Sequence, residues 1–123
     1  MITQIDVNPW GRRLYVVVGE TDARVKAFFK KREGFQECFT IDPASEAETV
    51  VTDKGHVVIR FGPVTKEPTA LAELIAHECM HATYRMLSYV GIALTLDTEE
   101  VYAYQLEYLI REVTKAIKKT KRK

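Results

Sequence analysis

Three residues near the middle of the chain, His77, Glu78 and His81, form the pattern HExxH in the run HECMH. Side chains four positions apart on an α-helix share one face, with Cβ atoms about 5–6 Å apart, so both imidazoles can reach one metal ion. Glu78 is rotated by about 100° from His77 around the same helix, towards a water molecule on that ion. The pattern therefore predicts a Zn²⁺ site with His77 and His81 as ligands. Glu78 is the predicted general base that activates water for attack on a carbonyl carbon.

A catalytic zinc ion usually has three protein ligands, so the pattern leaves one ligand to be found. The chain holds only three histidines and none follows His81, which leaves a Glu, an Asp, a Cys or the upstream His56. Glu99 and Glu100 follow His81 by 18 and 19 residues, at the start of the next predicted helix. An eight-residue connection turns that helix back antiparallel to the first. Whether it reaches the histidines is left open by the sequence.

Residues 71–109 resemble the core of the gluzincins, HExxH metallopeptidases whose third zinc ligand is a Glu on a following helix. They are particularly similar to the minimal single-domain versions that are common in phages and bacterial mobile elements. In these proteins the ligand often begins an ExxA pattern. Residues 100–104, EVYAY, match it, whereas Glu99 would place Tyr102 at the position of the Ala. The resemblance implies Glu100 as the third ligand and zinc-dependent hydrolysis of a peptide or protein substrate. It also implies that residues 55–61 form the edge strand that pairs with substrate.

Hydrophobic periodicity and turn residues predict the elements that must position these side chains. The predicted elements are a strand at 13–19, a helix at 22–32, a short strand at 38–41, a hairpin at 47–61 that turns at 53–55, and helices at 68–90 and 98–118. Strands followed by two long helices are typical of an α+β domain. Together with the resemblance, this order predicts a zincin-like fold. A small mixed or antiparallel sheet would pack on the HExxH helix and on the following helix that carries Glu100.

Composition and charge favour one ordinary globular domain that spans residues 1–123. Apolar residues make up 46% of the chain and charged residues 28%, and the formal net charge is +1. This balance argues against a protein that coats nucleic acid in general. The positive charge gathers at one end, because residues 111–123 carry seven Lys or Arg against one Glu. Residues from about 115 to 123 are therefore predicted to form a basic tail.

The number of cysteines and the hydropathy of the chain indicate the cellular compartment in which the protein is expected. Cys38 and Cys79 are too few and too widely spaced for a disulfide framework, which favours a reducing, cytoplasmic setting. No signal peptide is evident. No apolar stretch reaches the roughly 18 residues of a membrane span, so no membrane partner is expected.

Each candidate residue also has a purely structural explanation. The two histidines can be ordinary polar residues of a helix, and Asp97 with Glu100 fits a capping box. His56 follows the glycine of the hairpin and is expected at the surface. Cys79 points away from the histidine face and is expected in the core. Three tyrosines of the last helix are more often packing residues than donors to an oxyanion: Tyr102, Tyr104 and Tyr108.

Two functions other than hydrolysis stay open at this point. A non-catalytic adaptor or inhibitor can keep a zincin-like scaffold and bind a host protein. A nucleic-acid-associated protein can use the sequence KAIKKTKRK at the end of the chain to bind phosphates, with an affinity that falls as salt rises.

Overall fold

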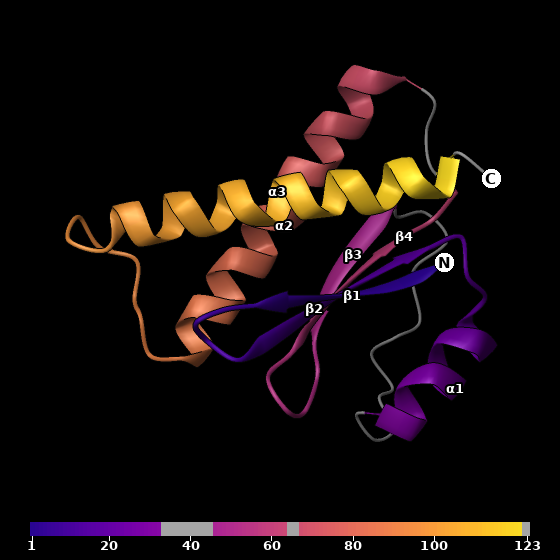
Figure 1. Ribbon diagram of the computed structural model, residues 1–123, viewed down its shortest axis with the longest axis horizontal. Helices are drawn as coiled ribbons and strands as arrows, with labels where there is room; N and C mark the ends of the chain where they lie inside the picture. The colour runs from indigo at the N-terminus through magenta and orange to yellow at the C-terminus, as the bar shows by residue number, and fades with distance from the viewer. Residues whose placement is uncertain (33–45, 64–66, 122–123) are drawn as a thin grey trace.

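A four-stranded sheet carries one helix on one face and two long helices on the other (Figure 1). The computed structural model describes residues 1–32, 46–63 and 67–121. The elements in chain order are β1 (Ile2–Val7), β2 (Arg12–Val18), α1 (Asp22–Arg32), β3 (Ala47–Val51), β4 (Val57–Phe61), α2 (Pro68–Tyr89) and α3 (Glu99–Lys121). The architecture is α+β, as the sequence predicts.

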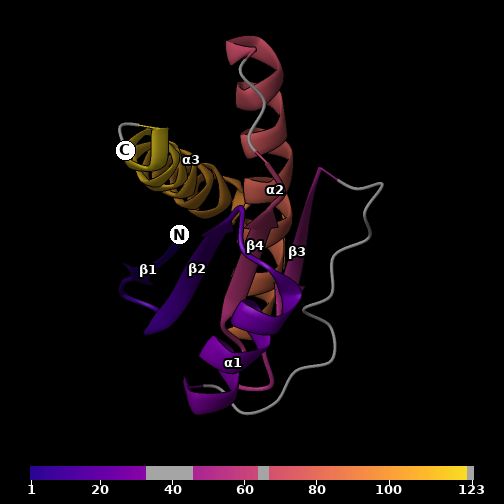
Figure 2. The same ribbon diagram turned by 90° about the vertical axis from the view of Figure 1, so that its right-hand side faces the viewer.

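The strands lie in the order β1-β2-β4-β3, and Figure 2 shows β3 at the outer edge of the sheet beside α2. β1 with β2 and β3 with β4 are antiparallel pairs joined by short turns. β2 and β4 form the parallel pair that joins the two hairpins. A parallel pair needs a long crossover, and the chain between β2 and β4, which includes α1, makes it.

The main core lies between the sheet and the two long helices. Successive residues of a strand point to opposite faces, so the unbroken apolar run of β2 is typical of a strand that is covered on both sides. Leu14, Val16 and Val18 point towards α2 and α3, whereas Tyr15 and Val17 point towards α1. The fully or largely buried residues that the two helices contribute are Ile75, Cys79, Ala82, Met86, Leu109, Val113, Ala116 and Ile117.

α1 covers the other face of the sheet. Phe29 packs edge to face on Tyr15, with ring centroids 5.0 Å apart. Arg60 of β4 is buried on this side, pairs with Asp22 at 2.5 Å and donates to the backbone carbonyl of Glu20 at 2.7 Å. A buried guanidinium is costly without partners, so these contacts anchor the start of α1 to the centre of the sheet.

The predicted helices at 22–32 and 68–90 and the predicted hairpin at 47–61 are confirmed. The prediction missed β1, in which Ile5 and Val7 are buried while Gln4 and Asp6, which alternate with them, are exposed. That alternation is the sequence signal of a half-buried strand. The short strand predicted at 38–41 lies outside the described residues.

α3 continues to Lys121, beyond the predicted end at residue 118. Much of the predicted basic tail is therefore the last part of a helix. Ala116 and Ile117 are buried in the main core, and this burial holds the last turns in place. Within the described ranges, no helix is both long and apolar enough to cross a membrane.

The prediction that residues 55–61 form the edge strand is wrong. β4 occupies a central position between β2 and β3, and all five of its residues are buried. Residues on both faces of a central strand are covered, and the apolar run VVIRF reflects this. The edge strand of the described sheet on the α2 side is β3, which is half-buried along its length.

The hydrogen-bond pattern of β3 fixes which of its backbone groups face outward. Gly62 donates to the carbonyl of Glu46 at 3.0 Å, and Thr52 donates to the carbonyl of His56 at 2.7 Å. Residues of an antiparallel pair alternate between those bonded to the partner strand and those that face away. Ala47 and Thr49 therefore direct their backbone N–H and C=O groups away from β4. This side of β3 is called its open edge, because the described part of the chain adds no further strand there.

The turn between β3 and β4 packs on the end of α2 through Gly55. This residue has a φ of 81°, and a Cβ added to it would lie 2.2 Å from Cζ of Tyr89. The guanidinium carbon of Arg12 lies 5.0 Å from the centre of the same Tyr89 ring. Gly11 gives a matched comparison, since its φ is 66° but an added Cβ would meet nothing within 4 Å.

We expect Gly55→Ala to lower the free energy of unfolding more than Gly11→Ala, by about 1 kcal/mol. Both substitutions force a side chain into the left-handed region, but only the first must displace the Tyr89 ring. Urea titration of both variants measures the difference. In a Tyr89→Ala background the two substitutions should cost the same, and a difference that persisted there would contradict this explanation.

Candidate active site

The rotation of α2 about its own axis is set by an apolar stripe that packs on the sheet. The stripe recurs at three- and four-residue intervals and consists of Ile75, Cys79, Ala82 and Met86. Residues of a helix are spaced by about 100°, so burial of this stripe leaves His77 and His81 together on the exposed face. Glu78 lies at the border between the two faces and is only 5% exposed.

His77 and His81 meet across one turn of α2. Their Nε2 atoms are 3.2 Å apart, and their rings lie edge to face with centroids 4.9 Å apart. Two nitrogen ligands of one tetrahedral zinc ion, each about 2.0–2.1 Å from it, are about 3.3 Å from each other. The same separation also fits an N–H···N hydrogen bond, in which one ring donates and the other accepts. The structure therefore brings the two predicted ligands to a spacing that a shared ion fits.

Glu78 is held by the edge strand. The hydroxyl of Thr49 in β3 donates to Oε2 of Glu78 at 2.6 Å and lies 3.3 Å from the backbone carbonyl oxygen of the same residue. A buried carboxylate needs such a partner, and a hydrogen bond to a charged acceptor is among the stronger ones. This contact joins α2 to β3 and fixes one oxygen of the Glu78 carboxylate.

A groove runs along α2 where the helix faces β3. It consists of two hollows, both lined by Ala47 and Glu78. The N-terminal hollow has a volume of about 460 Å³ and includes His77. The C-terminal hollow has a volume of about 240 Å³ and includes His81. Both histidines and the buried carboxylate thus open onto one groove that the edge strand borders.

Glu100, the predicted third ligand, is exposed in the first turn of α3. In the ranges that the structure describes, no group of three His, Cys, Asp or Glu side chains could hold a metal ion. The two histidines are therefore brought together without Glu99 or Glu100, and the assignment of Glu100 stays a prediction. The capping box would need Asp97 to be the residue just before the helix. That residue is instead Thr98, because α3 begins at Glu99 and the Thr98 carbonyl accepts the N–H of Tyr102 at 3.2 Å.

Two other candidate ligands serve the fold. The prediction that His56 lies at the surface is wrong. Its side chain is only 8% exposed, because the hairpin turn folds it against β2. Nδ1 of the His56 ring accepts the backbone N–H of Arg13 at 3.0 Å, and the backbone N–H of His56 donates to the hydroxyl of Thr52 at 3.0 Å. Cys79 lies in the core, as predicted. Burial, and then the charge of Glu78, raise the pKa of the Cys79 thiol to about 12, so it stays protonated.

The tyrosines of α3 divide into packing residues and one exposed residue. The hydroxyl of Tyr102 donates to the carbonyl of Ile92 at 2.6 Å, and that of Tyr108 donates to the carbonyl of Asp6 at 3.0 Å. These two hydroxyls tie α3 to its preceding connection and to β1. Tyr104 is exposed. None of the three lines the groove beside β3.

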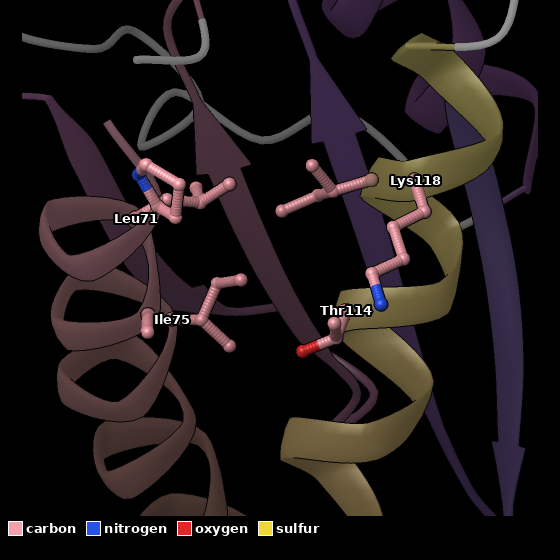
Figure 3. Close-up of a pocket in the computed structure, with 7 residues that line it drawn as sticks. Leu71, Ile75, Thr114 and Lys118 are labelled. Atoms are coloured by element: carbon pink, nitrogen blue, oxygen red, sulfur yellow. The ribbon is translucent and has the colours of Figure 1, made fainter. Parts of the chain in front are cut away.

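A further hollow lies between α2 and α3, on the side of α2 away from the histidines. Figure 3 shows Leu71 and Ile75 of α2 facing Thr114 and Lys118 of α3 across it. Its volume is about 210 Å³. Its lining is apolar apart from the Thr114 hydroxyl and the Lys118 ammonium, and it offers no acid–base pair for hydrolysis. The histidines and the buried carboxylate lie instead in the groove beside β3.

Five polar or charged residues of the groove were not identified from the sequence: Glu46, Glu48, Thr49, Glu73 and Arg85. Glu73 and Arg85 stand four residues before His77 and four residues after His81, so helical periodicity places all four side chains along one face. Thr49 has no such signal. Its contact with Glu78 depends on how α2 packs on β3, which no local pattern of the sequence fixes.

Comparison of the chain with protein-family models, characterised proteins and solved structures finds no significant match.

The first turn of the helix that carries the histidines is capped by Glu67. Its carboxylate accepts the N–H of Thr69 at 3.0 Å and that of Ala70 at 2.6 Å, and Pro68 occupies the first turn. These backbone hydrogen bonds, the one from Ala70 first, hold the pKa of Glu67 below its usual value of 4.5. The ionised carboxylate therefore stabilises the start of α2.

Because this pKa is lower in the folded protein, the stabilisation is present above about pH 4.5 and is lost as the pH falls through the folded pKa. We expect Glu67→Gln to lower the melting temperature at pH 7. The variant should also make the melting temperature less sensitive to pH between about pH 5 and 3, followed by circular dichroism. Glu107→Gln, on the exposed face of α3, is the control that should behave as wild type. Equal melting temperatures for wild type and Glu67→Gln at pH 7 would refute this role.

Proposed function

We propose that the protein is a zinc-dependent hydrolase, a metallopeptidase with a zincin-like fold that cleaves a peptide or protein substrate. The observation that carries the proposal is the 3.2 Å separation of the Nε2 atoms of His77 and His81 beside the buried carboxylate of Glu78. Two exposed imidazoles converge there, and all three side chains open onto one groove. Such convergence is typical of a metal site with a general base.

The donor set suits Zn²⁺. Imidazole nitrogens and carboxylate oxygens are common ligands of this ion. His77 and His81 would each supply Nε2, and Glu100 would supply the third donor, as the resemblance to gluzincins implies. When bound, the ion lowers the pKa of a coordinated water towards about 7 and polarises the carbonyl group of the substrate.

Glu78 acts as the general base in this proposal. Its carboxylate accepts a proton from the attacking water as the water oxygen bonds to the carbonyl carbon. The proton then passes to the amide nitrogen as the C–N bond breaks, which yields a carboxylic acid and an amine. Thr49 already donates to Oε2, so Oε1 is the oxygen that takes the proton.

The edge strand offers a place for the substrate backbone. The outward N–H and C=O groups of Ala47 and Thr49 can pair with an extended peptide, which then adds to the sheet as a further strand. A peptide in this position runs along the groove and passes Glu78, because Glu78 lines both hollows.

A protein-binding function without catalysis is a second candidate, and exposed apolar side chains favour it. Leu94 and Leu96 in the connection between α2 and α3 are exposed, Leu96 to 90%, and Tyr104 follows on α3. Exposed apolar side chains that lie close together in the sequence can contribute to a surface that binds another protein. This candidate requires neither hydrolysis nor an intact Glu78.

The purified protein should bind about one Zn²⁺ per chain, measured by elemental analysis after dialysis and by competition with a chelator. His77→Ala and His81→Ala should each weaken binding by more than about a hundredfold, because loss of an outer partner alone costs about 10–100-fold. Glu100→Gln should weaken it as well, while Glu99→Gln should not. Wild-type affinity in both histidine variants would refute the metal site. Loss of affinity in Glu99→Gln alone would make Glu99 the third ligand.

Glu78→Gln should keep the metal and lower kcat on the best-cleaved peptide of a synthetic library by about 10²–10⁴-fold, the usual contribution of a general base. Thr49→Val should lower kcat about tenfold with little effect on KM, because the carboxylate loses its hydrogen bond while the groove keeps its shape. Thr49→Ser keeps the hydroxyl and should restore kcat. Undiminished hydrolysis by Glu78→Gln would contradict the mechanism, and undiminished biological activity without any hydrolysis would favour the adaptor.

A further inference from the structure

The groove beside β3 carries opposite charges at its two ends. Glu46 and Glu73 are exposed and line the N-terminal hollow, where no described Lys or Arg joins them. Arg85 is exposed and lines the C-terminal hollow. Glu48 also borders this second hollow but is already engaged in another interaction. The charged side chains of the N-terminal hollow are therefore all carboxylates, and this end is called the acidic end. Arg85, beside Glu48 and Glu78 in the C-terminal hollow, is the one described Lys or Arg that lines the groove, and its end is called the basic end.

β3 and α2 run in the same direction along the groove, and Figure 2 shows them side by side. Residues 46–47 of the strand region lie with residues 70–78 of the helix in the N-terminal hollow. Residues 47–49 lie with residues 78–85 in the C-terminal hollow. The acidic end thus coincides with the start of β3, the basic end lies further along the strand, and Glu78 stands between the two.

A substrate strand can pair with the open edge of β3 in either direction, and the antiparallel pairing is the more stable and the more common one. An antiparallel peptide runs from the basic end of the groove to the acidic end. Residues before the cleaved bond then face Arg85, and residues after it face Glu46 and Glu73. We propose that the groove selects extended peptides with an acidic residue on the amino side of the cleaved bond and a basic residue on the carboxyl side. This inference rests on the proposed hydrolase function and specifies its substrate class.

The spacing along α2 gives the positions of the two charges in the substrate. Glu73 precedes Glu78 by five residues, and Arg85 follows it by seven. At a rise of 1.5 Å per helical residue, these separations are about 7.5 and 10.5 Å along the axis. An extended peptide advances about 3.3 Å per residue, so the basic residue should stand about two to three positions after the cleaved bond. By the same measure the acidic residue should stand about three to four positions before it.

The test is digestion of a mixed peptide library by the zinc-loaded full chain, with the cleavage products sequenced by mass spectrometry. We expect Lys and Arg to be enriched after the cleaved bond and Asp and Glu before it, at these positions. A synthetic peptide of that pattern and its charge-swapped partner then give a direct comparison. The first should have the higher kcat/KM, by about three- to tenfold, as one or two exposed ion pairs provide.

Charge-reversal variants separate the two ends of the groove. Glu73→Lys should remove the preference for a basic residue on the carboxyl side and leave the amino side unchanged. Arg85→Glu should do the reverse. Glu107→Lys and Lys119→Glu make the same charge changes on the surface of α3 and should leave both preferences as they are in wild type.

The outcomes distinguish this inference from the function on which it rests. Absence of zinc binding and of any cleavage would refute the hydrolase and the substrate class together. Cleavage without charge asymmetry, or faster cleavage of the charge-swapped peptide, would overturn the substrate class alone. Equal effects of the groove variants and the α3 variants would also overturn it, because net charge and not the groove would then set the preference.

Discussion

The apolar stripe of α2 packs against the sheet, and this packing decides where every other side chain of the helix points. With Cys79 and Met86 turned inward, His77 and His81 can only face outward together, and Glu78 can only lie at the border. The hydrogen bond from Thr49 then fixes the carboxylate against β3. A shift in the rotation of α2 would move His77, His81 and Glu78 together and take the Glu78 carboxylate away from Thr49, since one rigid helix carries all three.

The histidine pair could be predicted from the sequence because its spacing is local. Two residues one helical turn apart meet wherever a helix forms, and apolar periodicity defines that helix clearly. Burial of Cys79 could be predicted for the same reason. The partner of Glu78 could not, because Thr49 lies in another layer of the fold and is joined to α2 only by tertiary packing. Glu100 shows the same limit, since its distance from the histidines depends on how the chain wraps between α2 and α3.

The position of a strand within the sheet could not be predicted from its residue pattern alone. The run VVIRF of β4 is equally compatible with an edge strand under a cleft and with a central strand, and only the pairing with β2 decides between them. His56 was misplaced because a turn residue usually faces solvent, whereas here its ring accepts a backbone N–H from β2. β1 was missed although Ile5 and Val7 alternate with polar residues, which is the sequence signal of a half-buried strand.

The parallel pairing of β2 with β4 has a consequence for the order of folding. Leu14 pairs with Val57, and closing so long a stretch of chain costs more entropy and time than closing a hairpin turn. β3, β4 and α2, by contrast, follow one another directly in the sequence, and they supply the histidines, Glu78 and Thr49. These four side chains of the groove can therefore come together from neighbouring segments, without a long loop closure. The hairpin of β1 and β2 needs the longer closure, and it supplies residues to the core but no side chain to the groove.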